Sequence, residues 1–332
     1  MASFTVFKGS KGGMVVESSS PRPDQLRGDK VLVRITASGL CGTDLHYLDQ
    51  DMVLGHEGVG IVEAVGPDSK FLKKGDRVGF GYEHDSCGNC HQCLTGNETY
   101  CLNRAIYGSP NVDQGSFASH AIMRESFLHQ IPEGMSDVDA APLQCAGATV
   151  FSVLRAPEGG PTETIGVMGL GGLGHLAIQF AAKMGNRVIV LSSSDSKRDE
   201  ALKLGAHEFV ATRGQKTLRV SSPINRLLVT TSAQPDWEQI LPIMAPRSVI
   251  APLSVAEGNF EIPYMPLVLQ GIAVRGSLVA PRNLHREMLA FAALHGIRPV
   301  TEVFPLTEEG IREAVGRLRR GEVHLRAVLT AV

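Results

Sequence analysis

The sequence predicts an α/β protein that combines a β-rich portion with a doubly wound parallel sheet. Short apolar stretches separated by Gly and Asp turns fill much of the first 131 residues, as in a small closed or partly closed β-structure. Further on, a strand, a glycine loop, a helix and a second strand succeed one another within about thirty residues, which is the order of a βαβ unit. The length of 332 residues allows about two domains.

The N-terminal elements are expected to be short strands. Residues 31–35 form a β-branched run after a Gly-Asp turn, 59–66 form a second apolar stretch punctuated by glycines, and 71–78 lead into a third. Strand character returns over 115–131. The cysteine-rich segment 87–101 is expected to protrude from these strands as a loop.

The pattern changes from residue 140. Small residues predict a helix over 140–153, and helical spacing recurs over 175–184. Helical periodicity prevails again from about 280, and the strand-like stretch 327–329 lies near the end. Four apolar stretches are typical of buried parallel strands: 164–168, 187–191, 227–230 and 249–251.

Composition indicates a globular protein without an electrostatic partner. The chain is 43% hydrophobic and 20% charged, with a formal net charge of −2, so nothing favours nucleic acid or an anionic membrane. No stretch approaches the roughly 18 uncharged apolar residues of a membrane span. The first residues lack the apolar core of a signal peptide. We therefore expect a cytosolic (cytoplasmic) protein.

Four of the six cysteines have the spacing of a closed metal site. They are Cys87, Cys90, Cys93 and Cys101, in the pattern Cys-x2-Cys-x2-Cys-x7-Cys. Four thiolates at such spacing wrap one tetrahedral ion and leave no open position, which predicts a structural zinc. An iron–sulfur cluster uses the same ligands, and four unligated thiols are the remaining alternative.

The segment 41–57 concentrates reactive side chains. These are Cys41, Thr43, Asp44, His46, His56 and Glu57. Thiolate and imidazole are ligands that zinc prefers, and a catalytic zinc needs only three protein ligands because its fourth position must stay open. Cys41 and His56 can supply two of the three. The third must come from elsewhere in the chain.

The glycine loop of the βαβ unit is the expected dinucleotide site. It consists of Gly169, Leu170, Gly171, Gly172, Leu173 and Gly174. Such a loop lets the backbone approach a pyrophosphate at the helix N-terminus. The next strand runs into Ser192, Ser193 and Ser194, with Lys197 nearby, where an NAD site would carry a carboxylate. Hydroxyl and ammonium groups can bind a 2′-phosphate, which predicts NADP(H). The alternative is a solvated helix start with Ser194 or Ser196 as N-cap.

These motifs occur in an order that resembles the zinc-dependent medium-chain alcohol dehydrogenases, over essentially the whole chain. The glycine loop with His175, the triple serine with Lys197, and residues 275–277 and 322–326 are most similar to the cinnamyl alcohol dehydrogenase branch. The resemblance implies a zinc-dependent oxidoreductase that transfers a hydride between NADPH and an aldehyde or ketone, or oxidises the alcohol in the reverse direction.

The resemblance also implies the domain arrangement. A GroES-like β-barrel catalytic domain would comprise residues 1–145 and 280–332. A Rossmann NADP-binding domain, residues 146–279, would be inserted between these segments. The implied cofactors are two zinc ions per chain, one catalytic and one structural, and NADP(H). The family further implies a homodimer joined through the Rossmann sheets.

The roles of the metal-site residues follow from the same resemblance. Cys145, otherwise expected to be an inert buried thiol, is implied as the third ligand of the catalytic zinc. Asp44 is implied as the partner that orients the ring of His56. Glu57 is implied as a transient ligand of the metal during water exchange.

The proton relay and further cofactor contacts are also implied by the family. Thr43 and His46 would pass a proton through the nicotinamide ribose to solvent, and imidazoles suit this task because they titrate near neutral pH. A plain strand residue and a plain surface histidine are the alternatives. Ser277 and Arg326 are implied as cofactor contacts, with Arg326 reaching the pyrophosphate.

Two departures from the family bear on the substrate. The segment between His46 and Gly55 is several residues shorter than the usual loop, which predicts a more open pocket for a bulkier carbonyl compound. Residues 278–280 replace a Gly-Ser pair that relatives often carry. The alternative enzyme is a zinc-dependent reductase of a conjugated C=C or C=N bond, and the alternative of another class is a non-catalytic zinc- and NADPH-binding protein. A polyol dehydrogenase is disfavoured because that branch usually has a carboxylate in place of Cys145.

Overall fold

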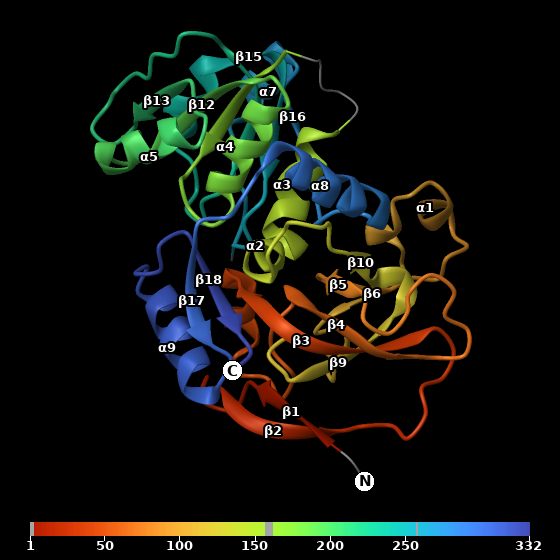
Figure 1. Cartoon of the computed structure of the whole chain (residues 1–332). Helices are drawn as coiled ribbons and strands as arrows, with labels where there is room; N and C mark the ends of the chain where they lie inside the picture. Colours follow the sequence, from red (N-terminus) through yellow and green to blue (C-terminus); the bar gives the residue numbers. More distant parts are fainter. Residues whose placement is uncertain (1–2, 157–161, 257) are drawn as a thin grey trace. The chain divides into compact units, whose positions relative to one another are not determined.

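The computed structural model describes residues 3–156, 162–256 and 258–332, and the chain divides into two compact units (Figure 1). Unit 1 comprises Met1–Ala148 and Val279–Val332, and unit 2 comprises Thr149–Leu278. Among the described residues, no helix combines the length and the apolar character needed to cross a membrane.

Unit 1 is built around the long strand β3 (Lys30–Leu40). Along one edge β3 pairs with β4 (Gly58–Val65), and along the other it pairs first with β9 (His120–Arg124) and then with β18 (Arg326–Thr330). The same sheet contains β5 (Arg77–Phe80), β10 (His129–Gln130) and β17 (Thr301–Pro305). The last strand of the chain therefore lies beside an early one, as Figure 1 shows.

The core of unit 1 brings this sheet together with α9 (Glu308–Arg319). Thr307 caps this helix by accepting a hydrogen bond from the backbone N–H of Gly310. Its buried residues Ile311, Ala314 and Val315 are spaced by three and one, so a single face meets the core. β-Branched residues of β3 belong to the same core cluster, namely Val31, Val33 and Ile35.

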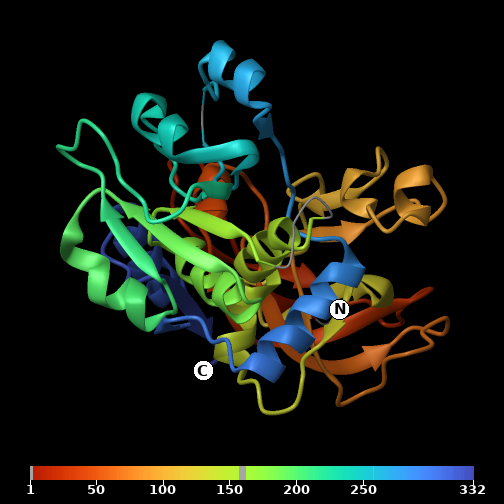
Figure 2. The ribbon, with the colours of Figure 1, turned by 90° about the horizontal axis from the view of Figure 1, so that it is seen from above.

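The cysteine lobe rests on a small sheet of its own. This sheet contains β6 (Glu83–Asp85), β7 (Ala105–Tyr107) and β8 (Pro110–Asn111). Between β6 and β7 the chain forms the short helices α1 (His91–Leu94) and η2 (Glu98–Tyr100), where the sequence predicted a plain loop. The lobe projects from the strands in both views (Figures 1 and 2).

The helical run predicted over 140–153 contains an irregular turn. It begins as α2 (Asp137–Pro142), passes through the π turn η4 (Leu143–Gly147) and continues as α3 (Ala148–Leu154). Pro142 has no N–H, so a regular backbone hydrogen bond is missing immediately before the π turn. Such single π turns occur often at functional sites.

The described part of unit 1 has five further elements. They are β1 (Ser3–Lys8), β2 (Val16–Pro21), the 3₁₀ turns η1 (Gly42–Tyr47) and η3 (Glu125–Phe127), and α8 (Arg282–His295). β1 and β2 pair antiparallel as a separate ribbon. α8 ends at Gly296, whose φ of 65° suits glycine at this position.

Unit 2 is a parallel sheet in the order β13-β12-β11-β14-β15-β16. Its strands are β11 (Thr164–Met168), β12 (Arg187–Ser192), β13 (Glu208–Ala211), β14 (Ile224–Val229), β15 (Met244–Pro252) and β16 (Ala273–Val274). Its helices and 3₁₀ turns are α4 (Gly174–Lys183), η5 (Asp195–Lys197), α5 (Arg198–Lys203), α6 (Trp237–Ile240), η6 (Leu241–Ile243) and α7 (Tyr264–Gln270). Counted from β11, the order is 3-2-1-4-5-6, that of a dinucleotide-binding sheet. The predicted doubly wound parallel sheet is confirmed.

Candidate metal centre and cofactor site

Four side chains of unit 1 converge on one point. They are Cys41, His56, Glu57 and Cys145, and one ligand atom from each lies within 4.8 Å of the others. Three of them come from the segment predicted as reactive. Cys145 joins them from the π turn η4, and three of the four side chains are buried, Cys41 being half-buried.

Asp44 holds two members of this cluster in place. Its Oδ2 accepts a hydrogen bond from the backbone N–H of Cys41 at 2.9 Å, and its Oδ1 accepts one from His56 Nδ1 at 2.8 Å. When His56 is neutral with its proton on Nδ1, its Nε2 offers a lone pair to a metal ion. Nε2 of His56 and Oε1 of Glu57 are both buried, and neither has a hydrogen-bond partner among the residues that the structure describes. Buried polar atoms rarely lack a partner, so the cluster fits a bound metal ion.

The charges of the cluster also suit a cation. The hydrogen bond with Cys145 lowers the pKa of Cys41 well below its usual value and raises that of Cys145. Burial alone would lower the pKa of His56, but the carboxylate of Asp44 outweighs it and raises that pKa. A divalent cation would displace the protons of these groups, because thiolate and neutral imidazole are its ligands.

Glu57 is backed by Arg326 from the C-terminal strand β18. Burial raises the pKa of Glu57 to about 7, and the guanidinium of Arg326 opposes this rise while donating to Oε2. Arg326 is 5% exposed, and its predicted contact with the cofactor pyrophosphate stays a prediction. A Cβ on Gly39 would lie 1.8 Å from Glu57 Oε2, so only glycine leaves room for this carboxylate.

Tyr107 contacts Gly55 and His56 in the segment 55–57. Its hydroxyl accepts a hydrogen bond from the N–H of Gly55 at 2.9 Å, and its ring centroid lies 4.8 Å from that of His56. Gly55 has φ of +86°, and a Cβ there would lie 2.4 Å from the ring of Phe117. Sequence reasoning missed both Gly39 and Tyr107. A glycine inside an apolar strand just before Cys41 was the available signal for the first, and none existed for the second.

Thr43 and His46 lie on the 3₁₀ turn η1 that follows Cys41. The hydroxyl of Thr43 is 3.6 Å from the sulfur of Cys41, at the edge of the cluster. His46 is exposed on the same turn. One side chain thus faces the cluster and the other faces solvent, while the relay between them stays a prediction.

The four cysteines of the lobe form the second cluster. Their sulfurs all lie within 4.8 Å of one another, with Cys90 and Cys93 3.5 Å apart and Cys87 and Cys93 3.9 Å apart. Backbone hydrogen bonds from Asn89 and Cys90 lower the pKa of Cys87 to about 6. Four sulfurs around one point fit a closed tetrahedral ion, and Cys101 completes the set from the buried side.

Two of the three motif glycines of the loop in unit 2 leave no room for a side chain, and the third leaves its backbone open. Gly169 has φ of +98°, and a Cβ there would meet Thr231 at 2.6 Å. A Cβ on Gly174 would lie 1.9 Å from the carbonyl oxygen of Gly169, so helix α4 can start close to the strand. A Cβ on Gly171 would meet nothing within 4 Å, which leaves its backbone open to a ligand. Leu173, after Gly172, is the N-cap of α4.

The serines predicted to select the cofactor border this loop. Ser192 is the last residue of β12, and Ser193 is exposed beside it. Ser194 precedes η5, but its side chain makes no capping hydrogen bond and contacts the Ser196 hydroxyl instead, at 2.9 Å. Lys197 donates to the carbonyl oxygen of Leu170 at 2.8 Å, which holds its ammonium group at the glycine loop.

An ion pair, a hollow and the predicted cofactor contact Ser277 also lie in unit 2. The nearby carboxylate Asp195 is engaged by Arg198 at 2.7 Å. A hollow of about 170 Å³ lies beyond the ends of β14 and β15, where doubly wound sheets bind ligands, and Thr231 and Ser254 are among its lining residues. Ser277 is half-buried and follows β16.

Comparison with known proteins assigns the family. A family model described as alcohol dehydrogenase GroES-like domain matches residues 27–133, and one described as zinc-binding dehydrogenase matches residues 172–293. An alcohol dehydrogenase of Geobacillus stearothermophilus is 34% identical over 319 residues, which are 92% of this chain and 92% of the relative. This chain belongs to the zinc-dependent medium-chain alcohol dehydrogenases.

Two further relatives agree with this assignment. The NADP-dependent alcohol dehydrogenase C 1 of Mycolicibacterium smegmatis is 34% identical and covers 88% of this chain and 87% of its own. The solved structure of a cinnamyl alcohol dehydrogenase from Sorghum bicolor superimposes with a TM-score of 0.90 at 30% identity, covering 99% of this chain and 98% of that one. The predicted family and the predicted fold, a GroES-like domain with a Rossmann domain, are confirmed for this dehydrogenase.

Replacing Gly39 by Ala tests the packing behind Glu57. The added methyl overlaps the Glu57 side chain, so we expect a loss of about 1–3 kcal/mol in the free energy of unfolding. We also expect release of metal from the Cys41 cluster but not from the cysteine lobe, measured by chemical denaturation and elemental analysis. Gly42→Ala is the matched control, since its Cβ would meet nothing within 4 Å. Normal stability and metal content in Gly39→Ala would contradict this account.

Proposed function

We propose that this dehydrogenase interconverts aldehydes or ketones and the corresponding alcohols with catalytic zinc and NADP(H). The observation that carries the proposal is the meeting of Cys41, His56 and Cys145 at one point. The fourth group there, Glu57, is drawn to Arg326 by a hydrogen bond. Two thiolates and one imidazole suit a catalytic zinc whose fourth position is open to a substrate oxygen, and one oxygen of Glu57 lies within 4.8 Å of their ligand atoms.

A second zinc in the cysteine lobe is part of the proposal. The four sulfurs of Cys87, Cys90, Cys93 and Cys101 match a closed structural site. The lobe is bound to the first turn of α8 because Glu98 accepts hydrogen bonds from Arg282. This zinc would stabilise the lobe and take no part in the reaction.

The chemistry divides between the cofactors and the side chains. Bound zinc supplies a Lewis acid that polarises the carbonyl group, and bound NADPH supplies the hydride. Thr43 lies at the edge of the cluster, where its hydroxyl can donate a proton to the substrate oxygen during reduction. His46, exposed on the same turn, can exchange that proton with solvent. In alcohol oxidation the proton travels the opposite way.

The preference for NADP(H) is supported by the groups beside the glycine loop. Ser192, Ser193 and Ser194 present hydroxyls at the end of β12, and Lys197 holds an ammonium group there. A 2′-phosphate gains hydrogen bonds and a favourable charge from such groups. The name of the mycobacterial relative agrees with this preference.

We further propose a homodimer formed by unit 2. The strand β16 (Ala273–Val274) is the edge of the sheet, and both of its residues are exposed. Helix α7 lies at the margin of unit 2 (Figure 2). Four of its apolar side chains are exposed: Tyr264, Met265, Val268 and Leu269. An open strand edge beside an apolar helix favours pairing with a second copy about a twofold axis.

The reaction is tested by an assay of the zinc-loaded enzyme with small and bulky aldehydes and ketones, using NADPH and NADH in parallel. We expect NADPH-dependent alcohol formation. Reduction of an enal at its C=C bond would favour the alternative reductase, and binding without turnover would favour a non-catalytic protein.

Ser193→Asp tests the cofactor preference. It should weaken the binding of NADPH and favour NADH, because the added carboxylate repels a 2′-phosphate. We expect the ratio of the kcat/KM values for the two cofactors to shift by at least about tenfold. Thr217→Asp adds the same charge on another loop and should leave the ratio unchanged.

His46→Ala tests the proton route. We expect kcat to fall by at least about tenfold, within the contribution typical of general acid–base groups, and its pH dependence to change. Zinc content should stay normal, because His46 lies outside the metal cluster. His295→Ala, in α8, is the control. Unchanged turnover in His46→Ala would remove this residue from the mechanism.

Leu269→Asp tests the dimer. Leu269 is 76% exposed in the single chain, so a charge there costs little in the monomer but would be buried in the proposed interface. We expect light scattering to report a dimer for the wild type and a monomer for Leu269→Asp. Leu294→Asp, at a leucine 80% exposed in unit 1, should remain dimeric. A dimer that survives Leu269→Asp would place the interface elsewhere.

A further inference from the structure

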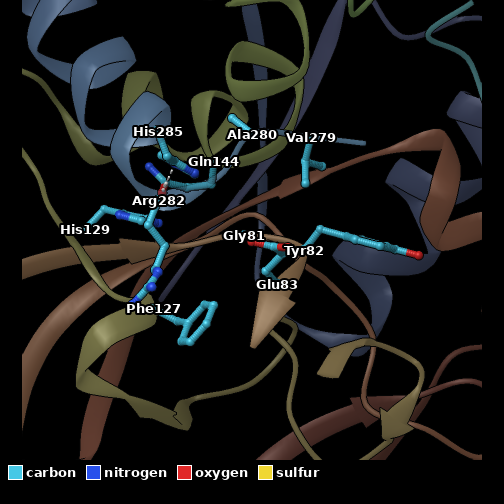
Figure 3. Close-up of a pocket in the computed structure, with 10 residues that line it drawn as sticks. All are labelled: Gly81, Tyr82, Glu83, Phe127, His129, Gln144, Val279, Ala280, Arg282 and His285. Atoms are coloured by element: carbon cyan, nitrogen blue, oxygen red, sulfur yellow. Dashed lines mark hydrogen bonds between the residues drawn. The ribbon is translucent and has the colours of Figure 1, made fainter. Parts of the chain in front are cut away.

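A buried polar contact lies directly beside the π turn that carries Cys145. Gln144, the residue before Cys145, is 1% exposed. Its Nε2 donates to the carbonyl oxygen of Ala140 at 3.0 Å, so its Oε1 must be the acceptor toward His285 Nε2, also at 3.0 Å. Figure 3 shows this hydrogen bond as a dashed line, with His129 beside it. The contact therefore requires the His285 tautomer that carries its proton on Nε2.

The donor ring of His285 stacks on a second imidazole. His285 stacks on His129 with ring centroids 3.9 Å apart and planes inclined by 18°. Burial lowers the pKa of His285 to about 3 and that of His129 well below its usual value, so both rings are neutral. His129 lies in β10, which pairs with β5 at Gly79. The imidazole that donates to Gln144 is thus fixed by a strand of the sheet.

The helix that carries His285 is anchored at its first turn. Arg282, three residues earlier, donates from its backbone N–H and from Nε to the same oxygen of Glu98, both at 2.8 Å. The guanidinium of Arg282 also lies 4.8 Å from the ring centroid of Phe127. This turn of α8 cannot slide without breaking these contacts, so the donor stays in register with Gln144.

Gln144, which accepts the hydrogen bond from His285, is also closely packed. A Cβ on Gly79 would lie 2.5 Å from the side-chain carbonyl carbon of Gln144, and a Cβ on Gly81 would lie 2.3 Å from its backbone oxygen. On the helix side, a Cβ on Gly147 would lie 3.2 Å from the sulfur of Met288 in α8. Both ends of the π turn are therefore packed against neighbours that leave no room for additional atoms.

A π turn needs such support because its backbone hydrogen bonds depart from the regular helical pattern. We propose that Gln144 and His285 are positioning residues that hold this turn so that the Cys145 thiol faces Cys41 and His56. The inference rests on the proposed function, since it takes Cys145 as a ligand of the catalytic zinc. His285 is not a member of the group of potential metal ligands formed by Cys41, His56, Glu57 and Cys145.

The test uses the zinc in the cysteine lobe as an internal reference. Purified zinc-loaded protein is mixed with excess chromogenic chelator, and the release of each ion is followed. The catalytic ion is identified as the one missing from Cys145→Ser. For His285→Leu, which fills the space without a donor, we expect release of the catalytic ion to accelerate by about tenfold or more, the effect typical of groups behind a metal ligand. Release from the lobe should not change.

His285→Gln keeps an N–H donor and should restore release close to the wild-type rate. A cavity of about 10 Å³, room for about one water, adjoins the contact, which is why leucine is preferred to alanine as the disrupting residue. If His285→Leu does not fold, Gln144→Met removes the acceptor at similar side-chain length and should show the same selective loss. Unchanged release, or equal acceleration of both ions, in the variant that folds would overturn the inference. A wild-type protein that holds only one zinc would instead refute the proposed function.

Discussion

The carboxylate of Asp44 is the constraint on which the metal centre depends. It is buried, and its two oxygens bind two different parts of the cluster, the backbone of Cys41 and the ring of His56. A buried carboxylate is costly unless it is fully hydrogen-bonded. This one carboxylate therefore joins the residue that follows β3 to the segment 55–57. The ring nitrogen that would face the metal is oriented by the same bond.

Charge balance gives a second reason for this arrangement. Cys41, Asp44 and Glu57 are three acidic groups in one buried region, and Arg326 offsets only part of their charge. Without an ion, protons must supply the rest, as the raised pKa values of His56 and Glu57 indicate. A divalent cation would replace those protons, because its ligands are thiolates, carboxylates and neutral imidazoles.

The cysteine lobe and the glycine loop could be predicted from the sequence because their residues lie close together along the chain. The four lobe cysteines lie within fifteen positions, and the glycine loop is continuous, so short-range geometry suffices to recognise them. Cys145 was assigned only through family resemblance, because its approach to Cys41 results from the packing of a helix on a distant strand.

The features that the sequence did not predict depend on packing between segments that lie far apart in the chain. Small residues over 140–153 predict a helix, but the π turn depends on Pro142 and on contacts with α8 that no local pattern reveals. Gly39, Tyr107 and His285 are ordinary strand or helix residues until long-range pairing brings each to its partner.

The C-terminal segment explains why unit 1 is discontinuous in sequence. Arg326 of β18 binds Glu57, the neighbour of the predicted ligand His56, and His285 of α8 binds Gln144, the neighbour of the predicted ligand Cys145. Residues 279–332 thus make a hydrogen bond to the residue after His56 and to the residue before Cys145. A chain that ended after unit 2 would lack the guanidinium that opposes the charge of Glu57 and the imidazole that supports the π turn. Unit 2 is inserted in the sequence of unit 1, and the contacts behind the candidate metal centre are complete only with the segment that follows it.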